Sequence, residues 1–278
     1  MKKISRRSFM AAAAVSVAAL ALTACGGSAS SAASSVASSA ASSEAVSSAA
    51  AAELTTVEAG KLTMATNAAF PPYEMTTDAG EFEGIDVDTA KAIAEKLGLE
   101  LQIDDMDFDA ALLSVQQGKA DIVMAGVTVT DERKAVMDFS DSYATGIQSI
   151  IVPEGSDIAS PDDLAGKKIG TQRGTTGYIY CSDDFGDENV VAYDDGLTAV
   201  QALNNGQVDA VVIDNAPAQE FVAANPGLKV LDTSYAEEDY AIGVAKGSAL
   251  EDAVNKALEE LKADGTLQAI VDKYINAN

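Results

Sequence analysis

Two hydrophobic periods alternate along the chain from about residue 61 onward. Short apolar runs predict strands at 61–66, 99–103, 120–126, 167–172, 189–193 and 208–214. Apolar residues at three- and four-residue spacing predict helices at 86–98, 109–118, 175–181 and 197–206, and two more within 249–275. Strands that alternate with helices indicate an α/β fold whose sheets are largely parallel.

Two stretches of this pattern share one plan and lie 88 positions apart: ALLSVQQGKADIVMAG at 111–126 and AVQALNNGQVDAVVID at 199–214. In each, a helix ends at a glycine (Gly118, Gly206), and an aspartate (Asp121, Asp209) precedes a buried strand. The repeat predicts two comparable lobes. The alternative is that many helix–glycine–strand units have this pattern without being related.

The carboxyl ends of these two strands are the first candidates for a binding site, because ligands of open α/β sheets bind beyond that edge. The first strand ends at Gly126, with Thr128 close behind, and the second ends at Asp214. If the lobes face each other, these residues meet across a cleft.

Residues 1–58 lack the pattern and are predicted to lie outside the fold. A basic start, MKKISRRSFM, precedes a short apolar run at 11–22, which is typical of a signal peptide covering 1–24. SRRSFM resembles a twin-arginine export signal, although the two arginines could simply supply positive charge. LTAC resembles the lipobox of bacterial lipoproteins and predicts lipidation of Cys25; an ordinary cleavage site before a cysteine is the alternative. The Ser/Ala-rich segment 25–58 is expected to form a flexible tether.

Composition excludes several classes of function. The chain has 18 basic and 43 acidic residues and no histidine. A Ser-His-Asp triad is therefore impossible, and the commonest zinc ligand is absent, so we expect neither a metal nor a cofactor. The negative charge argues against nucleic acid as a partner. Cys181 is expected to be a buried free thiol.

Arginine is scarce, and its positions are informative. Outside the signal segment only Arg133 and Arg173 occur, and each follows closely after a predicted strand. The guanidinium group fits a carboxylate through two parallel hydrogen bonds, so both positions suit an acidic ligand group. For Arg133, a surface ion pair with Asp131 or Glu132 is the alternative.

Several motifs resemble the solute-binding proteins of polar amino-acid ABC transporters: ATNAAFPPYE, FEGIDVDTAKAIAEKLG, AGVTVTDERKAVMDFSDSY, GTQRGTTGY and VDAVVIDNAPA. The resemblance runs from about residue 60 to 278. It implies a two-lobed, periplasmic-binding-protein-like fold of type II, with one lobe formed by 59–148 and 240–278 and the other by 149–239. Hinge strands are expected near 146–152 and 239–244.

The same resemblance implies a site for the two charged ends of a free amino acid. Arg133 would hold the α-carboxylate. Gly126, through its backbone, and Thr128, through its N–H and hydroxyl, would complete that contact, with Thr176 contributing a donor from the second lobe. Asp214 would accept hydrogen bonds from the α-ammonium group.

The resemblance also implies contacts to the ligand's side chain. Phe70 and Phe108 would flank it, unless they are simply core residues. Asn67, Gln172 and Arg173 would set specificity. Many relatives have an aspartate where this chain has Asn67, and Arg173 adds positive charge, so we expect a neutral polar or acidic ligand such as glutamine, cystine or glutamate.

The predicted function is that of an extracytoplasmic receptor, monomeric and attached to the membrane by its lipid, which delivers an amino acid to an ABC permease. The ATPase would be a separate protein, because the chain has no GxxxxGK[ST] motif. Lipid anchoring favours a bacterium with a single membrane. We expect no enzymatic activity. The alternatives are a dehydratase of the cyclohexadienyl or arogenate type, with Asp214 as its acid, and the ectodomain of a sensor.

Overall fold

The computed structural model describes residues 54–275, all of which belong to one compact unit. The predicted signal peptide, Cys25 and most of the predicted tether lie outside the described residues. The last five residues of the tether, 54–58, lie against the fold: Leu54 packs on a hydrophobic cluster, and the Val57 N–H donates to Asp121 Oδ1 at 2.8 Å.

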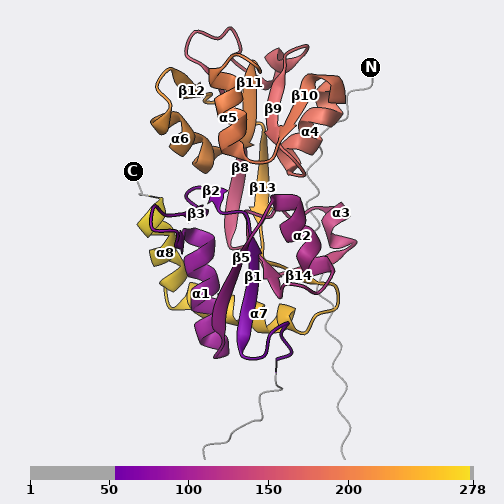
Figure 1. Cartoon of the computed structure of the whole chain (residues 1–278), viewed down its shortest axis with the longest axis vertical. Coiled ribbons are helices and arrows are strands. Elements are labelled where there is room, and N and C mark those ends of the chain that lie inside the picture. Colours follow the sequence, from indigo (N-terminus) through magenta and orange to yellow (C-terminus); the bar gives the residue numbers. More distant parts are fainter. Residues whose placement is uncertain (1–53, 276–278) are drawn as a thin grey trace, which may run out of the picture. The chain divides into compact units, whose positions relative to one another are not determined.

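The first lobe contains a five-stranded sheet in the order β5-β1-β6-β14-β7 (Figure 1). Its strands are β1 (Lys61–Thr66), β5 (Glu100–Asp105), β6 (Ile122–Val123), β7 (Met137–Phe139) and β14 (Gly243–Ala245). Its helices are α1 (Ile85–Leu97), α2 (Phe108–Gln116), α3 (Asp131–Lys134), α7 (Leu250–Ala263) and α8 (Thr266–Tyr274). A small antiparallel sheet joins β2 (Ala69–Phe70), β3 (Glu74–Thr76) and β4 (Phe82–Glu83).

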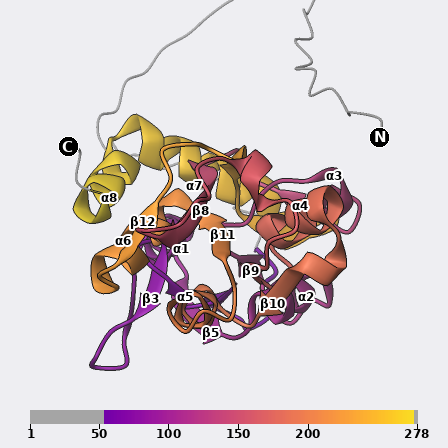
Figure 2. The same cartoon turned by 90° about the horizontal axis from the view of Figure 1, so that it is seen from above.

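The second lobe contains a six-stranded sheet in the order β10-β9-β11-β8-β12, with β13 also paired to β8. Its strands are β8 (Ala144–Pro153), β9 (Ile169–Gln172), β10 (Val190–Tyr193), β11 (Ala210–Asp214), β12 (Leu228–Val230) and β13 (Ala236–Tyr240). Its α-helices are α4 (Thr176–Phe185), α5 (Gly196–Asn204) and α6 (Asn215–Ala224), and two short 3₁₀ helices cover Pro161–Leu164 and Asp187–Asn189. Seen from above, helices surround this sheet (Figure 2).

The predicted α/β fold is confirmed, but each sheet is parallel only in part. β1 runs parallel to β5 and β6, and β9 runs parallel to β10 and β11. β14 and β8 run against these strands. The hydrophobic pattern could not show this, because an apolar run predicts a strand without its direction. The reversed strands are those that follow or precede a passage of the chain from one lobe to the other.

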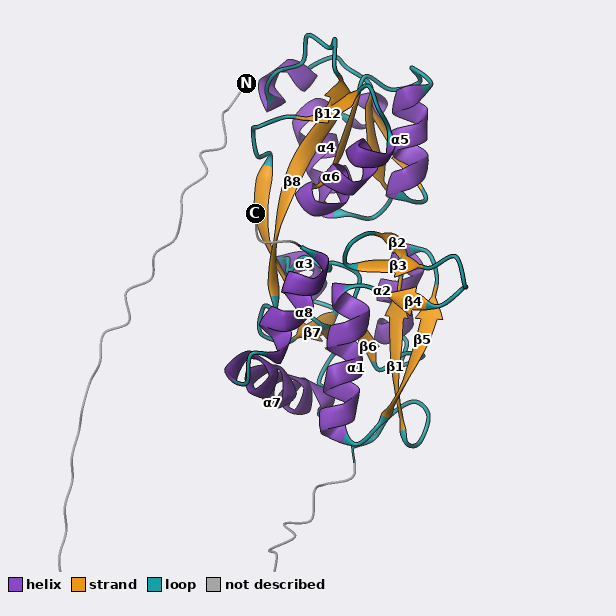
Figure 3. Cartoon of the chain, turned by 90° about the vertical axis from the view of Figure 1, so that its left-hand side faces the viewer, coloured by secondary structure: helices purple, strands orange, loops and turns teal. Residues whose placement is uncertain are grey.

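Two strands, β8 and β13, join the lobes and pair with each other from Ala144–Tyr240 to Gln148–Ala236 (Figures 1 and 3). The predicted boundary after residue 148 falls within β8, and the one after residue 239 falls near the end of β13. The Tyr240 ring lies directly against Gly146, where an added Cβ would come within 2.4 Å of the ring. This position therefore requires glycine.

Each lobe has its own hydrophobic core. In the first, β1 and α1 pack with α7 through buried residues such as Leu62, Ile93 and Leu258. In the second, separate clusters include Val211 in one and Val212 in the other, because neighbouring residues of a strand point to opposite faces of the sheet. Cys181 is buried, as predicted. None of the helices within 54–275 combines the length and hydropathy needed to cross a membrane.

Candidate functional site

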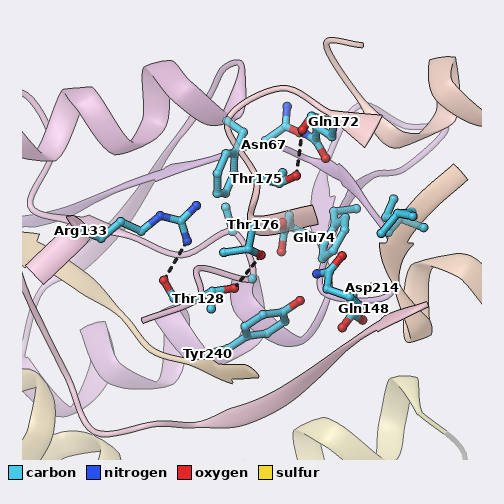
Figure 4. Close-up of a pocket in the computed structure, with 16 residues that line it drawn as sticks. Asn67, Glu74, Thr128, Arg133, Gln148, Gln172, Thr175, Thr176, Asp214 and Tyr240 are labelled. Atoms are coloured by element: carbon cyan, nitrogen blue, oxygen red, sulfur yellow. Dashed lines mark hydrogen bonds between the residues drawn. The ribbon is translucent and has the colours of Figure 1, made fainter. Parts of the chain in front are cut away.

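A pocket lies where the two lobes meet, and its empty space of about 450 Å³ includes a part that is open to solvent (Figure 4). Nine of the ten residues predicted to bind a ligand line it: Asn67, Phe70, Phe108, Gly126, Thr128, Arg133, Gln172, Thr176 and Asp214. The ends of strands in both lobes supply several of them. β1 ends just before Asn67, β9 ends at Gln172, and β11 ends at Asp214.

Arg133 is buried, with 9% of its surface exposed, on the one-turn helix α3. Thr130 caps this helix by accepting a hydrogen bond from the Arg133 N–H at 3.2 Å. The guanidinium donates to the Thr128 carbonyl at 2.8 Å and to the Gly174 carbonyl of the second lobe at 3.2 Å, and it lies 5.3 Å from the centre of the Phe108 ring. Phe108 is itself buried beneath it.

No carboxylate among residues 54–275 forms an ion pair with Arg133. The alternative of a surface pair with Asp131 or Glu132 is therefore not what the structure contains. Burial lowers the pKa of Arg133, and the negative charge of Glu238 opposes this shift. A buried cation without an ionic partner is costly, and an anion bound in the pocket would offset that cost.

Asp214 is a buried acidic residue of the second lobe, with 2% of its surface exposed. It caps α6: Oδ1 accepts from the Ala216 N–H at 3.0 Å, while Oδ2 accepts from the Ile147 N–H at 2.7 Å. Burial raises the pKa of Asp214 to about 6, against the opposing effect of these two hydrogen bonds. Asp214 has no cationic partner among the described side chains.

Gly126 and Thr128 line the same pocket. Gly126 has a φ of 55°, and a Cβ there would come 2.9 Å from the Phe70 ring, so the turn requires glycine. Its N–H donates to Asp86 Oδ2 at 3.0 Å. The Thr128 hydroxyl donates to Glu238 Oε2 at 3.1 Å and lies 3.4 Å from the Thr176 hydroxyl.

Thr176 begins α4, the ten-residue helix whose N-terminus lies beside the pocket. Thr175 caps it by accepting from the Tyr178 N–H at 3.3 Å. The first N–H groups of an α-helix have no partner within the helix and carry partial positive charge. This end of α4 is therefore suited to an anion.

Asn67 of the first lobe and Gln172 of the second lobe form a hydrogen bond that connects the lobes beside the pocket. Gln172 Nε2 donates to Asn67 Oδ1 at 2.9 Å, and Asn67 Nδ2 donates to the Met106 carbonyl at 3.0 Å. Arg173 is the predicted residue that the structure does not bring into this pocket. Its side chain is 55% exposed and lies 3.5 Å from Asp194 Oδ1, beside a neighbouring pocket. Because side chains alternate along an extended chain, Gln172 faces the ligand pocket and the next residue turns away.

Sequence reasoning missed four polar residues that line the pocket: Glu74, Gln148, Thr175 and Tyr240. Glu74 belongs to the motif FPPYE and Tyr240 to a predicted hinge strand, so both lay in segments already singled out. Both oxygens of Glu74 are buried without a donor from N–H or hydroxyl groups among the described residues. Burial and the nearby Asp86 carboxyl raise the pKa of Glu74 well above its usual value.

Comparison with known proteins identifies the group to which this architecture belongs. Residues 62–277 match the model of the bacterial extracellular solute-binding proteins, family 3. The chain belongs to this family. A family 3 relative described as a probable histidine-binding protein, from Neisseria gonorrhoeae, is 35% identical over 95% of this chain and 94% of its own length.

Two further relatives extend the comparison. The L-cystine-binding protein TcyJ of Escherichia coli K12 is 34% identical over 80% of this chain and 85% of its own. A solved structure of an ancestral arginine-binding protein bound to glutamine is 44% identical, with a TM-score of 0.75, and it covers 78% of this chain and 98% of its own. These relatives are binding proteins rather than enzymes, so a solute-binding role, and not the dehydratase alternative, applies to this family 3 chain.

Proposed function

We propose that this protein binds one free amino acid between its lobes and delivers it to an ABC permease. A single observation carries the proposal: a buried cation, Arg133, and a buried anion, Asp214, line the same pocket from opposite lobes, and neither has an ionic partner among residues 54–275. A zwitterion satisfies both charges at once.

The α-carboxylate would bind between Arg133 and the N-terminus of α4. Arg133 offers the planar donor pair that fits a carboxylate, and the Thr176 end of α4 offers backbone N–H groups with partial positive charge. These donors belong to different lobes. A bound carboxylate would therefore stabilise the arrangement in which the lobes are close together.

The α-ammonium group would bind at Asp214. This carboxylate is fixed by two backbone N–H groups and has to be ionised to receive a cation. A site that uses both charges discriminates against analogues that lack either one, because one buried group is then left unpaired.

For the side chain, we propose a neutral polar ligand first and an acidic ligand second. Three uncharged amides, from Asn67, Gln148 and Gln172, also line the pocket. Arg173, which would favour an acidic side chain, lies outside the pocket next to Asp194. The ligands named for these relatives, histidine, cystine, arginine and glutamine, support an amino acid without selecting one of them.

The lipid anchor and the permease complete the proposal. LTAC supports lipidation of Cys25, and membership of a family of extracellular solute-binding proteins supports a location outside the cytoplasm. A diacylated cysteine would hold a monomeric receptor at the membrane, beside a permease that has its own ATPase. Replacing Cys25 by serine should release the protein from membranes into the soluble fraction, or leave it unprocessed. Unchanged retention that requires detergent would contradict the anchor.

A thermal-shift screen of the protein against the twenty amino acids and cystine tests the binding proposal. A ligand that binds only the folded state raises the melting temperature, and calorimetry then gives its Kd. We expect glutamine or another neutral polar amino acid to give the largest increase. If no amino acid changes the melting temperature or binds in calorimetry, the function is wrong. Micromolar binding of lysine, with none of glutamine, cystine or glutamate, would contradict only the proposed specificity.

A further inference from the structure

Glu238 is a buried carboxylate that no motif singled out. It lies on β13, one of the two strands that join the lobes, and only 6% of its surface is exposed. Its Oε2 accepts two hydrogen bonds, from the Thr128 hydroxyl at 3.1 Å and from the Gln148 side-chain amide at 3.0 Å. Both donors line the candidate pocket.

The direction of the hydrogen bond to Thr128 is fixed by chemistry. A carboxylate accepts hydrogen bonds and cannot donate them, so the single hydroxyl proton of Thr128 points toward Glu238. Thr128 Oγ1 can then only accept in its contact with the Thr176 hydroxyl, 3.4 Å away, and it keeps a second lone pair. The Thr128 hydroxyl is therefore an acceptor for whatever occupies the pocket.

An acceptor suits the ammonium end of the ligand and not its carboxylate. The sequence analysis expected the Thr128 hydroxyl to help hold the carboxylate, and this geometry opposes that part of the expectation. The Thr128 carbonyl is already occupied by Arg133, at 2.8 Å. The hydroxyl oxygen is therefore the acceptor of Thr128 that remains for the ligand.

We propose that Glu238 is a positioning residue that makes the Thr128 hydroxyl an acceptor for the α-ammonium group of the bound amino acid, alongside Asp214. This inference rests on the proposed function. Glu238 also adds a negative charge that acts on Arg133. Its hydrogen bond from Gln148 on β8 links Glu238, on β13, to the other strand that joins the lobes.

Glu238→Gln tests the inference, because it keeps the shape of the side chain but can place an N–H beside Thr128. The hydroxyl proton could then turn into the pocket. We expect the Kd for glutamine, or for the amino acid that binds most tightly in the screen, to rise about 10- to 100-fold, as for the loss of one hydrogen bond to a charged group. Glu237→Gln, an exposed change one residue away, is the matched control and should leave Kd unchanged.

A second ligand separates this role from a merely structural one. Glutaramate is glutamine without its α-amino group, so it cannot use the Thr128 acceptor. Glu238→Gln should weaken glutamine strongly and glutaramate by less than about twofold. Equal losses for both ligands, or wild-type affinity for glutamine, would overturn the inference.

Substitutions at Thr128 keep the test decisive if Glu238→Gln does not fold. Thr128→Ser retains the hydroxyl and should retain affinity, whereas Thr128→Val should show the same selective loss of glutamine. Adding Glu238→Gln to Thr128→Val should then change Kd little further, because the group that Glu238 positions is gone. A Thr128→Val variant that binds glutamine normally would also overturn the inference. Failure of the wild-type protein to bind any amino acid would instead reject the proposed function.

Discussion

The helix–strand units α2–β6 and α5–β11 have the same backbone construction but lead to residues of opposite charge. In both, a nine-residue helix is followed by a left-handed glycine, Gly118 with φ 65° and Gly206 with φ 67°. In both, an aspartate then accepts a backbone N–H from a neighbouring segment at 2.8 Å: Asp121 from Thr63, and Asp209 from Lys168.

The two units differ at the point where the strand leaves the sheet. After β6, the chain turns at Gly126 and leads to the cation Arg133. β11 ends directly in the anion Asp214. The comparison shows that the scaffold determines where a ligand group can lie, while the few residues after each strand determine its charge. The following predictions test that separation, from the largest expected effect to the smallest.

Arg133→Ala should have the largest effect on binding. Removing one partner of a buried, hydrogen-bonded charge pair costs about 2–5 kcal/mol, which corresponds to a rise in Kd of roughly 30- to several thousand-fold. Calorimetry with the best amino acid from the screen measures this. Arg173→Ala is the matched control, and we expect its Kd to stay within about threefold of wild type, since Arg173 lies outside the pocket. A larger loss of affinity for Arg173→Ala than for Arg133→Ala would show that Arg173, and not Arg133, binds the carboxylate.

Asp214→Asn should have the second-largest effect on ligand affinity, and it should also remove the dependence of that affinity on pH. The pKa of Asp214 in the protein is raised to about 6, so its carboxylate becomes protonated as the pH falls through that value. The protonated form cannot pair with an ammonium group. Wild-type affinity should therefore fall by up to about tenfold per pH unit below pH 6 and level off above it. Calorimetry between pH 5 and pH 8 should give a flatter profile for Asp214→Asn. A parallel profile would assign the titration to another group.

Asp121→Ala should affect stability and leave binding nearly unchanged. Asp121 is buried and accepts two backbone N–H groups, from Val57 and Thr63. Its loss should lower the free energy of unfolding by about 3 kcal/mol. Asp209→Ala, which removes one hydrogen bond at an exposed site, should cost at most about 1.5 kcal/mol. Urea denaturation measures both values. Equal costs would mean that burial does not distinguish the two aspartates.

Gly118→Ala and Gly206→Ala should have the smallest effects, and those effects should match. Nothing lies within 4 Å of a Cβ added at either glycine, so each substitution meets only the strain of a left-handed residue. That strain costs about 1–2 kcal/mol. Equal shifts of the urea midpoint, with unchanged ligand affinity, are expected. A difference above about 1 kcal/mol would contradict the equivalence of the two units.

Much of the site could be predicted because strand ends converge at one edge of each sheet. Arg133, Thr128 and Asp214 all follow directly from that rule and from the family resemblance. Arg173 could not be placed in the same way, since one step along an extended chain reverses the direction of a side chain. Glu238 was missed for a different reason. It lies within a segment whose sequence predicts only a connection between the lobes. Its importance comes from a contact with Thr128, which is 110 positions away.

The hydrogen bond from Arg133 to the Gly174 carbonyl has a consequence for unloading. One arm of the guanidinium is held by the opposite lobe through the main chain, at 3.2 Å. Because this acceptor, the Gly174 carbonyl, belongs to the other lobe, separating the lobes to release a solute also breaks this bond, and the bond itself stabilises the arrangement in which the lobes are close together. Because that acceptor is a peptide oxygen, no substitution of a side chain at position 174 can abolish it without moving the loop itself.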